Sequence, residues 1–149
     1  MSAVGGFNLV EFRTEENIIV NRVDISPQRL AEFESHIFIV FTGIKRRASQ
    51  VVEKQLRRVE DNLETLKKMR KMVDQGWDIL TSNESFSKFG ELLHDAWIAK
   101  RSLDQGISNP EIDYLYELGR KNGAWGGKLL GAGAGGFRSE EHTSELQSH

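Results

Sequence analysis

The stretch GGKLLGAGAGGF, from Gly126 to Phe137, is the most distinctive in the chain and holds six of its fourteen glycines. Glycines let successive backbone N–H groups approach a phosphate closely, and a lysine beside them supplies a positive charge. The residues that carry this phosphate-binding hypothesis are Lys128, Gly131, Gly133, Gly135 and Gly136. A close crossing of two backbone segments would explain the same glycines. The stretch by itself leaves both interpretations open.

Two common glycine loops do not fit this stretch. A Walker A loop needs its lysine after the glycines and before Ser or Thr, whereas Lys128 precedes most of the glycines and Leu129 follows it. The G-x-G-x-x-G pattern is present at Gly131, Gly133 and Gly136. We expect a helix before this pattern, however, and a dinucleotide-binding loop follows the first strand of a β-α-β unit.

Three runs of β-branched and aromatic residues precede the stretch and predict strands over residues 6–12, 17–25 and 37–41. The first two are separated by a short polar segment, which predicts a β-hairpin. The third, Ile37 to Phe41, has five consecutive apolar residues and predicts a buried central strand.

Four helices are expected in the remaining segments. Apolar residues spaced mostly four and three apart, from Val52 to Leu80 by way of Val73 and Trp77, predict a long amphipathic helix over about residues 47–80. The other three should cover residues 27–34, 84–103 and 110–122, with these end signals: Ser26-Pro27, Asn83, a capping box of Ser108 and Glu111, and Asn122-Gly123. The order of the elements predicts an α+β fold, an incomplete antiparallel sheet packed by helices.

Composition and charge exclude several classes of protein. The chain has 149 residues and no cysteine, so neither a disulfide scaffold nor a cysteine-based zinc site is expected. No apolar run approaches the roughly 20 residues of a membrane-spanning helix, and the first residues do not resemble a secretory signal, which predicts a cytoplasmic protein. The net charge of −2 argues against a nucleic-acid partner. Neither a metal-ligand pattern nor a catalytic grouping is evident.

Residues 138–149 differ in character from the rest of the chain. The sequence RSEEHTSELQS resembles the in-frame translation of a widely used DNA sequencing adapter. We therefore expect this tail to be an artefact, to be disordered and to contribute nothing to the fold.

Several stretches together resemble one family. GGKLLGAGAGGF is similar to the third signature motif of the GHMP sugar-kinase superfamily, which includes galactokinase, homoserine kinase and mevalonate kinase. GGFNLVEF at residues 5–12, FTGIKRRAS at 41–49 and the whole segment 89–137 resemble, in the same order, the branch of D-glycero-D-manno-heptose 7-phosphate kinases. The resemblance spans Gly5 to Phe137 and implies the C-terminal part of a GHMP-type kinase, with a ferredoxin-like layer.

The resemblance also implies a function. Relatives of this type phosphorylate the anomeric hydroxyl of a heptose 7-phosphate with ATP and Mg²⁺, so the expected partners are a sugar phosphate and ATP, with no membrane. The family's Pro-x-x-x-Gly-Leu-x-Ser-Ser-Ala type loop and its acidic base precede the segment that matches Gly5. We therefore expect residues 1–137 to be a truncated kinase C-terminal domain that is inactive by itself.

Six residues are candidates for substrate binding: Thr42, Gly43, Arg46, His94, Trp97 and Lys100. The first three match a segment that borders the active cleft of the relatives, where an arginine can hold a phosphate through two hydrogen bonds. The others follow one another at intervals of three on a predicted helix and would bind a sugar hydroxyl, a sugar face and a phosphate. A solvated basic turn and ordinary core packing are the respective alternatives.

A helical interaction module is a second possible function, because the apolar stripe from Val52 to Leu80 also fits a coiled-coil seam. The two hypotheses differ in one observable. In a kinase the stripe packs on Phe86, Phe89, Leu93 and Trp97 of the same chain, whereas in a coiled coil these side chains have no partner within the chain.

Overall fold

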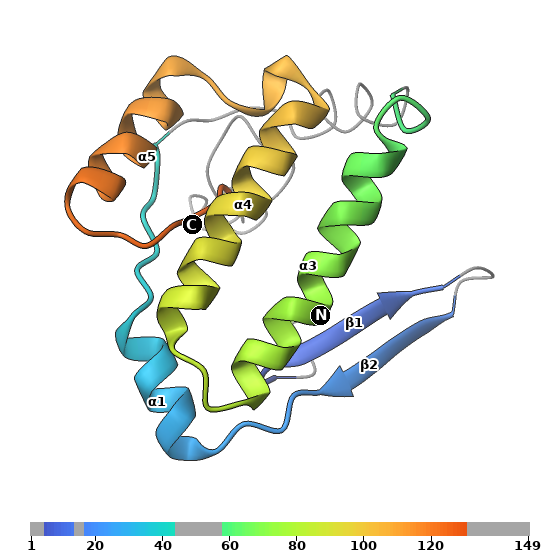
Figure 1. The fold of residues 1–149 in the computed structure, drawn as a ribbon, viewed down its shortest axis with the longest axis vertical. Coiled ribbons are helices and arrows are strands. Elements are labelled where there is room, and N and C mark those ends of the chain that lie inside the picture. Colours follow the sequence, from blue (N-terminus) through green and yellow to red (C-terminus); the bar gives the residue numbers. More distant parts are fainter. Residues whose placement is uncertain (1–4, 14–16, 44–57, 131–149) are drawn as a thin grey trace, which may run out of the picture.

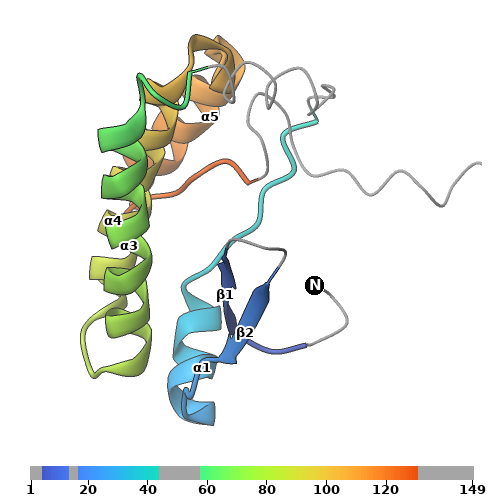
Figure 2. The same ribbon diagram turned by 90° about the vertical axis from the view of Figure 1, so that its right-hand side faces the viewer.

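The computed structural model describes residues 5–13, 17–43 and 58–130. The described elements are β1 (Asn8–Phe12), β2 (Ile18–Arg22), α1 (Pro27–Ser35), α3 (Leu63–Thr81), α4 (Phe86–Leu103), the short 3-10 helix η1 (Gln105–Ile107) and α5 (Pro110–Lys121). Helices α3, α4 and α5 lie together in one layer, and the hairpin and α1 lie beside the lower part of that layer (Figures 1 and 2). The predicted α+β class, an antiparallel sheet packed by helices, is confirmed.

The first two strands form the predicted hairpin. They pair antiparallel with Val10 opposite Val20, and Arg13 N–H donates to the carbonyl of Asn17 at 2.9 Å next to the turn. At the other end, Val23 N–H donates to the carbonyl of Phe7 at 2.9 Å. The described sheet contains these two strands only.

Helix α1 begins where its end signal predicts. The hydroxyl of Ser26 accepts a hydrogen bond from Arg29 N–H, and Pro27 occupies the first turn. The helix buries Phe33, whose ring lies 5.0 Å from that of Phe89 in an edge-to-face arrangement. Phe33 thereby joins the N-terminal part of the chain to α4.

Helices α3 and α4 pack along their lengths and form most of the core (Figure 1). The buried face of α3 is Met72, Gly76 and Ile79, and a Cβ atom added to Gly76 would lie 3.5 Å from Leu92. The predicted stripe is confirmed at Leu66, Met69 and Leu80, which pack against buried clusters. It is wrong at Val73, which is 44% exposed. Neighbouring stripes on one helix differ by a single residue, and only the position of α4 decides which one is buried.

The start of α3 also differs from the prediction. Residues 58–62 form turns and the helix begins at Leu63; the segment 44–57 lies outside the described residues. Phe86 and Phe89 pack with Ile79 of α3 and Phe33 of α1 in one cluster. Side chains that a coiled-coil seam would leave without intrachain partners are therefore packed within the chain, which contradicts the interaction-module hypothesis.

The prediction of a buried strand over Ile37 to Phe41 is wrong. This segment has no regular secondary structure, and its five side chains are 42–87% exposed. A strand is stable only when a neighbouring strand satisfies its backbone groups. Apolar composition alone does not supply that neighbour, and no described strand pairs with this segment.

Two helix starts are displaced from their predicted residues. Ser85, not Asn83, caps α4, because its hydroxyl accepts from Ser87 N–H. At α5 the side chain of Asn109 accepts from Ile112 N–H at 2.9 Å, so the capping box at Ser108 is wrong. The predicted end of α5 is confirmed, since Asn122 closes the helix and Gly123 follows with φ +93°.

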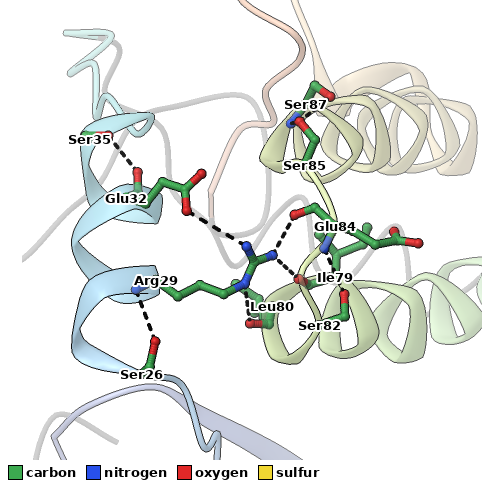
Figure 3. A network of polar contacts seen from close by, with 10 residues as sticks. All are labelled: Ser26, Arg29, Glu32, Ser35, Ile79, Leu80, Ser82, Glu84, Ser85 and Ser87. Atoms are coloured by element: carbon green, nitrogen blue, oxygen red, sulfur yellow. Dashed lines mark hydrogen bonds and ion pairs between the residues drawn. The ribbon is translucent and has the colours of Figure 1, made fainter.

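Arg29 fastens α1 to the end of α3 (Figure 3). Its guanidinium donates to the carbonyls of Ile79 at 2.6 Å, Leu80 at 3.2 Å and Glu84 at 2.7 Å. It also lies 4.1 Å from the ring centroid of Phe86. A cation at a helix C-terminus interacts favourably with unpaired carbonyls, so this side chain stabilises the junction of α1, α3 and α4.

The part of the chain that the structure describes contains no helix long and apolar enough to cross a membrane.

Candidate functional site

The first five residues of the glycine stretch are described, and they run along α4. Gly126 and Gly90 of α4 meet so closely that a Cβ atom on Gly126 would lie 1.9 Å from the carbonyl oxygen of Gly90. A Cβ on Gly90 would lie 2.4 Å from that of Trp125. A close crossing therefore explains Gly126. The sequence carried a signal for Gly90, because a glycine inside a helix costs about 1 kcal/mol relative to alanine and so suggests a packing role.

The glycines of the phosphate-binding hypothesis, Gly131, Gly133, Gly135 and Gly136, lie outside the described residues, and the hypothesis remains a prediction for them. Two contacts hold the segment that leads to them. Leu129 packs against the buried cluster of Trp97, Leu103, Ile107 and Ile112. The ammonium of Lys100 donates to the carbonyl of Leu129 at 3.0 Å.

A third attachment comes from α5. The guanidinium of Arg120 donates to the carbonyl of Ala124 at 2.8 Å and to that of Trp125. Sequence reasoning did not single out Arg120, and its place in the last turn of a helix that ends at Asn122 was the available signal. The segment 124–129 is therefore attached to both α4 and α5.

Two lysine side chains create a positive field beside the segment. Burial and, to a lesser extent, the positive charge of Lys128 together lower the pKa of Lys100 to about 8. Lys128 itself is exposed. An anion near both ammonium groups would reduce their mutual repulsion, so this end of α4 is suited to a phosphate.

The three candidate residues of α4 do not converge on a common ligand. Each step of three residues turns a helical position by about 60° from its predecessor, so His94 and Lys100 point about 120° apart. His94 Nδ1 hydrogen-bonds to the hydroxyl of Tyr116 on α5, whose pKa is raised, chiefly by burial. Lys100 instead points to Leu129.

Trp97 lies between these two residues and is only 1% exposed. Its indole is part of the core and is not open to stack on a sugar, so core packing, the alternative interpretation, is correct. Its Nε1 has no hydrogen-bond partner among the described residues. Neither Tyr116 nor this buried indole N–H was anticipated from the sequence.

Thr42 and Gly43 are the last described residues of the segment that follows α1. Gly43 has φ +71°, a conformation that favours glycine, and Arg46 lies outside the described residues. The start of this segment lies close to Trp125, the residue before Gly126, because the centroids of the His36 and Trp125 rings are 5.0 Å apart. Figure 2 shows this segment and the one after α5 on the same side of the helical layer.

In residues 5–13, 17–43 and 58–130, no group of three His, Asp or Glu side chains is arranged to hold a metal ion.

Known proteins resemble this chain in sequence and in fold. Residues 77–137 match the family model described as GHMP kinases C terminal. The chain is 32% identical over 135 residues to the D-glycero-alpha-D-manno-heptose 7-phosphate kinase of Campylobacter jejuni, which covers 89% of this chain and 40% of that protein. It is 35% identical over 116 residues to the bifunctional fucokinase/GDP-fucose pyrophosphorylase of Arabidopsis thaliana, covering 75% of this chain and 11% of that protein.

A solved structure supports the same fold. Mevalonate kinase of L. major in complex with R-mevalonate superposes with a TM-score of 0.67 at 21% identity, covering 89% of this chain and 39% of that one. The chain therefore has the α+β fold of the matching part of that structure. The match of residues 77–137 to the C-terminal region of the GHMP kinases agrees with the resemblance seen in the sequence. The chain spans about two fifths or less of the length of these relatives.

Proposed function

We propose that this chain is part of an ATP-dependent kinase that phosphorylates a sugar phosphate of the heptose 7-phosphate type at its anomeric hydroxyl. Its relatives are GHMP-superfamily kinases, named for a heptose phosphate, for fucose and for mevalonate. The observation that carries the proposal is the positive charge of Lys128 and Lys100 at the entry to the glycine stretch. Mg²⁺ would accompany ATP and be held largely by its phosphates.

The chemistry of phosphoryl transfer suits such a site. The protein contributes mainly position and charge stabilisation, because the transferred group passes through a transition state whose charge is spread over its oxygens. In this proposal Lys128 and the backbone N–H groups of Gly131, Gly133, Gly135 and Gly136 bind phosphate oxygens of ATP.

The sugar phosphate is assigned to other residues. Arg46 would hold its phosphate, and Thr42 and Gly43 would donate a hydroxyl and a backbone N–H to it. His94 would reach a sugar hydroxyl through the imidazole nitrogen that does not face Tyr116.

The substrate assignment can be tested with the longest natural open reading frame that contains residues 5–137. ADP release is measured with ATP and Mg²⁺ and with heptose 7-phosphate, fucose or mevalonate. We expect the kcat/KM for heptose 7-phosphate to exceed the others at least about tenfold, which corresponds to roughly 1.4 kcal/mol of transition-state stabilisation. A preference for fucose or mevalonate would contradict the proposed substrate but not the kinase activity.

A matched pair of variants tests the role of Lys128. Lys128→Met removes the charge at the glycine stretch, whereas Lys121→Met removes an exposed charge from the last turn of α5. Loss of a charged hydrogen bond to phosphate should raise the KM for ATP about 10- to 100-fold in Lys128→Met only. Equal KM values in the two variants would show that Lys128 does not bind ATP.

A further inference from the structure

We propose that Lys100 is a positioning residue, which holds the entry to the glycine stretch against α4 and does not bind substrate itself. The proposal rests on the proposed function, since the stretch that it positions is the one assigned to phosphate. It differs from the role that the sequence suggested for Lys100, and it rests on the hydrogen bond from the ammonium to a backbone carbonyl.

Both the backbone and the side chain of Leu129 are held in place. The ammonium donates to its carbonyl oxygen at 3.0 Å, while its side chain packs on the buried cluster that contains Trp97. Because burial lowers the pKa of Lys100 to about 8, the lysine remains mostly charged near neutral pH and can donate a charged hydrogen bond.

Two other contacts hold the same segment nearer to its start. Arg120 donates to the carbonyls of Ala124 and Trp125. The backbones of Gly126 and Gly90 cross so closely that neither position has room for a side chain. The segment has no regular secondary structure, so these side-chain donors satisfy backbone acceptors that a helix or sheet would otherwise satisfy. The contact from Lys100 is the last of the three before the dense glycines.

The location of this last contact explains its importance. Gly131, the first of the dense glycines, follows Leu129 by two residues. Glycines have more conformational freedom than other residues. Catalysis by positioning needs that freedom to be limited, because a misplacement of about 1 Å can lower a rate by about 10²-fold.

The first test measures the structure of the segment without using activity. Hydrogen exchange of the backbone amides of residues 124–130 is compared in Lys100→Met, Lys100→Arg and the control Lys88→Met, all made in the longest natural reading frame. Lys88 lies on the same helix, where it pairs with Glu84 at the surface. We expect exchange at least about tenfold faster in Lys100→Met, unchanged exchange in Lys88→Met, and near-normal exchange in Lys100→Arg, which keeps a charged donor. Unchanged exchange in Lys100→Met would overturn the proposal.

The second test separates positioning from substrate binding. Lys100→Met should lower kcat about 10- to 100-fold and change the KM for the sugar phosphate less than about threefold, and Lys100→Arg should restore kcat. A raised KM with unchanged kcat would make Lys100 a ligand and refute positioning. If the Met variant does not fold, Lys100→Leu, which also lacks a donor, takes its place with the same expectations.

The two tests also distinguish this proposal from the proposed function. If the natural protein releases no ADP with any sugar phosphate while Lys100→Met still accelerates exchange at residues 124–130, the assigned reaction is wrong and the structural role of Lys100 stands. If the natural protein is active and Lys100→Met leaves the exchange at residues 124–130 unchanged, the assigned reaction stands and the structural role of Lys100 is wrong.

Discussion

Substitution of Arg29 by methionine should loosen the junction between α1 and the end of α3. The variant keeps an unbranched apolar side chain over Phe86 but removes the donors to the carbonyls of Ile79, Leu80 and Glu84. The side chain of Arg29 is only 14% exposed, so water replaces these donors incompletely. The ion pair with Glu32, at 3.9 Å, contributes little because Glu32 is exposed.

The size of the effect follows from these contacts. Hydrogen bonds from charged groups contribute about 1.5–3 kcal/mol each, but contacts made by one side chain are not additive and water can reach part of the site. We expect a loss of about 2–4 kcal/mol in the free energy of opening this junction. Since about 1.4 kcal/mol is a factor of ten, exchange of the protected amides should accelerate about 30- to 700-fold.

Hydrogen exchange of peptides from residues 77–90, in the longest natural reading frame, measures this effect directly. Arg70→Met is the matched control: its guanidinium lies 2.6 Å from Asp74, but both side chains are 62% exposed. A solvated surface pair contributes little, so Arg70→Met should exchange as the wild type does despite the shorter ion pair. Arg29→Lys should be intermediate, because one ammonium cannot reach three separated carbonyls.

Equal exchange in Arg29→Met and Arg70→Met would refute this reasoning. It would mean that burial of Arg29 and its three hydrogen bonds do not stabilise the junction, and that the aromatic packing around Phe33 is sufficient.

Three further predictions concern other parts of the molecule. Gly126→Ala should lower the unfolding free energy by about 1–3 kcal/mol, since α4 has to move away; Gly127→Ala, whose Cβ meets nothing within 4 Å, is the control in a thermal melt. Phe38 is 87% exposed within an apolar run, so we expect the 149-residue chain to self-associate. In size-exclusion chromatography, Phe38→Lys should reduce this self-association. A monomeric unsubstituted chain would contradict the prediction. The pKa of Lys100 is about 8 in the folded protein and 10.5 ordinarily. Between these two pH values the unfolded state binds more protons than the folded state, so the free energy of unfolding should rise from pH 8 to 10.5. In urea unfolding, Lys100→Gln should lack this rise. Identical pH profiles for Lys100→Gln and the wild type would contradict the prediction.

Two predictions that rested on short-range signals are confirmed by the structure. Ser26 with Pro27 starts α1, and Asn122 with Gly123 ends α5. A cap is made by residues within about four positions of one another, so the chemistry of the cap is contained in the local sequence. Even here, caps one or two residues apart compete, and Asn109 replaced Ser108 because its amide oxygen receives the backbone donor.

Predictions that needed a distant partner were less successful. Ile37 to Phe41 has the composition of a central strand, but its strand character depends on a neighbour that the described residues do not provide. On α3 the predicted stripe included Val73, whereas the approach of α4 over Gly76 buries Met72 instead.

The candidate site shows the same division. The sequence by itself determined that the chain carries a lysine and glycines in the arrangement of a GHMP kinase motif, and the match of residues 77–137 confirms that family. Only the tertiary structure decided that Trp97 is core, that His94 faces Tyr116 and that Lys100 holds Leu129. Residue types and spacings specify which chemical groups a helix can present, whereas the direction in which each group is used depends on what the rest of the chain packs against that helix.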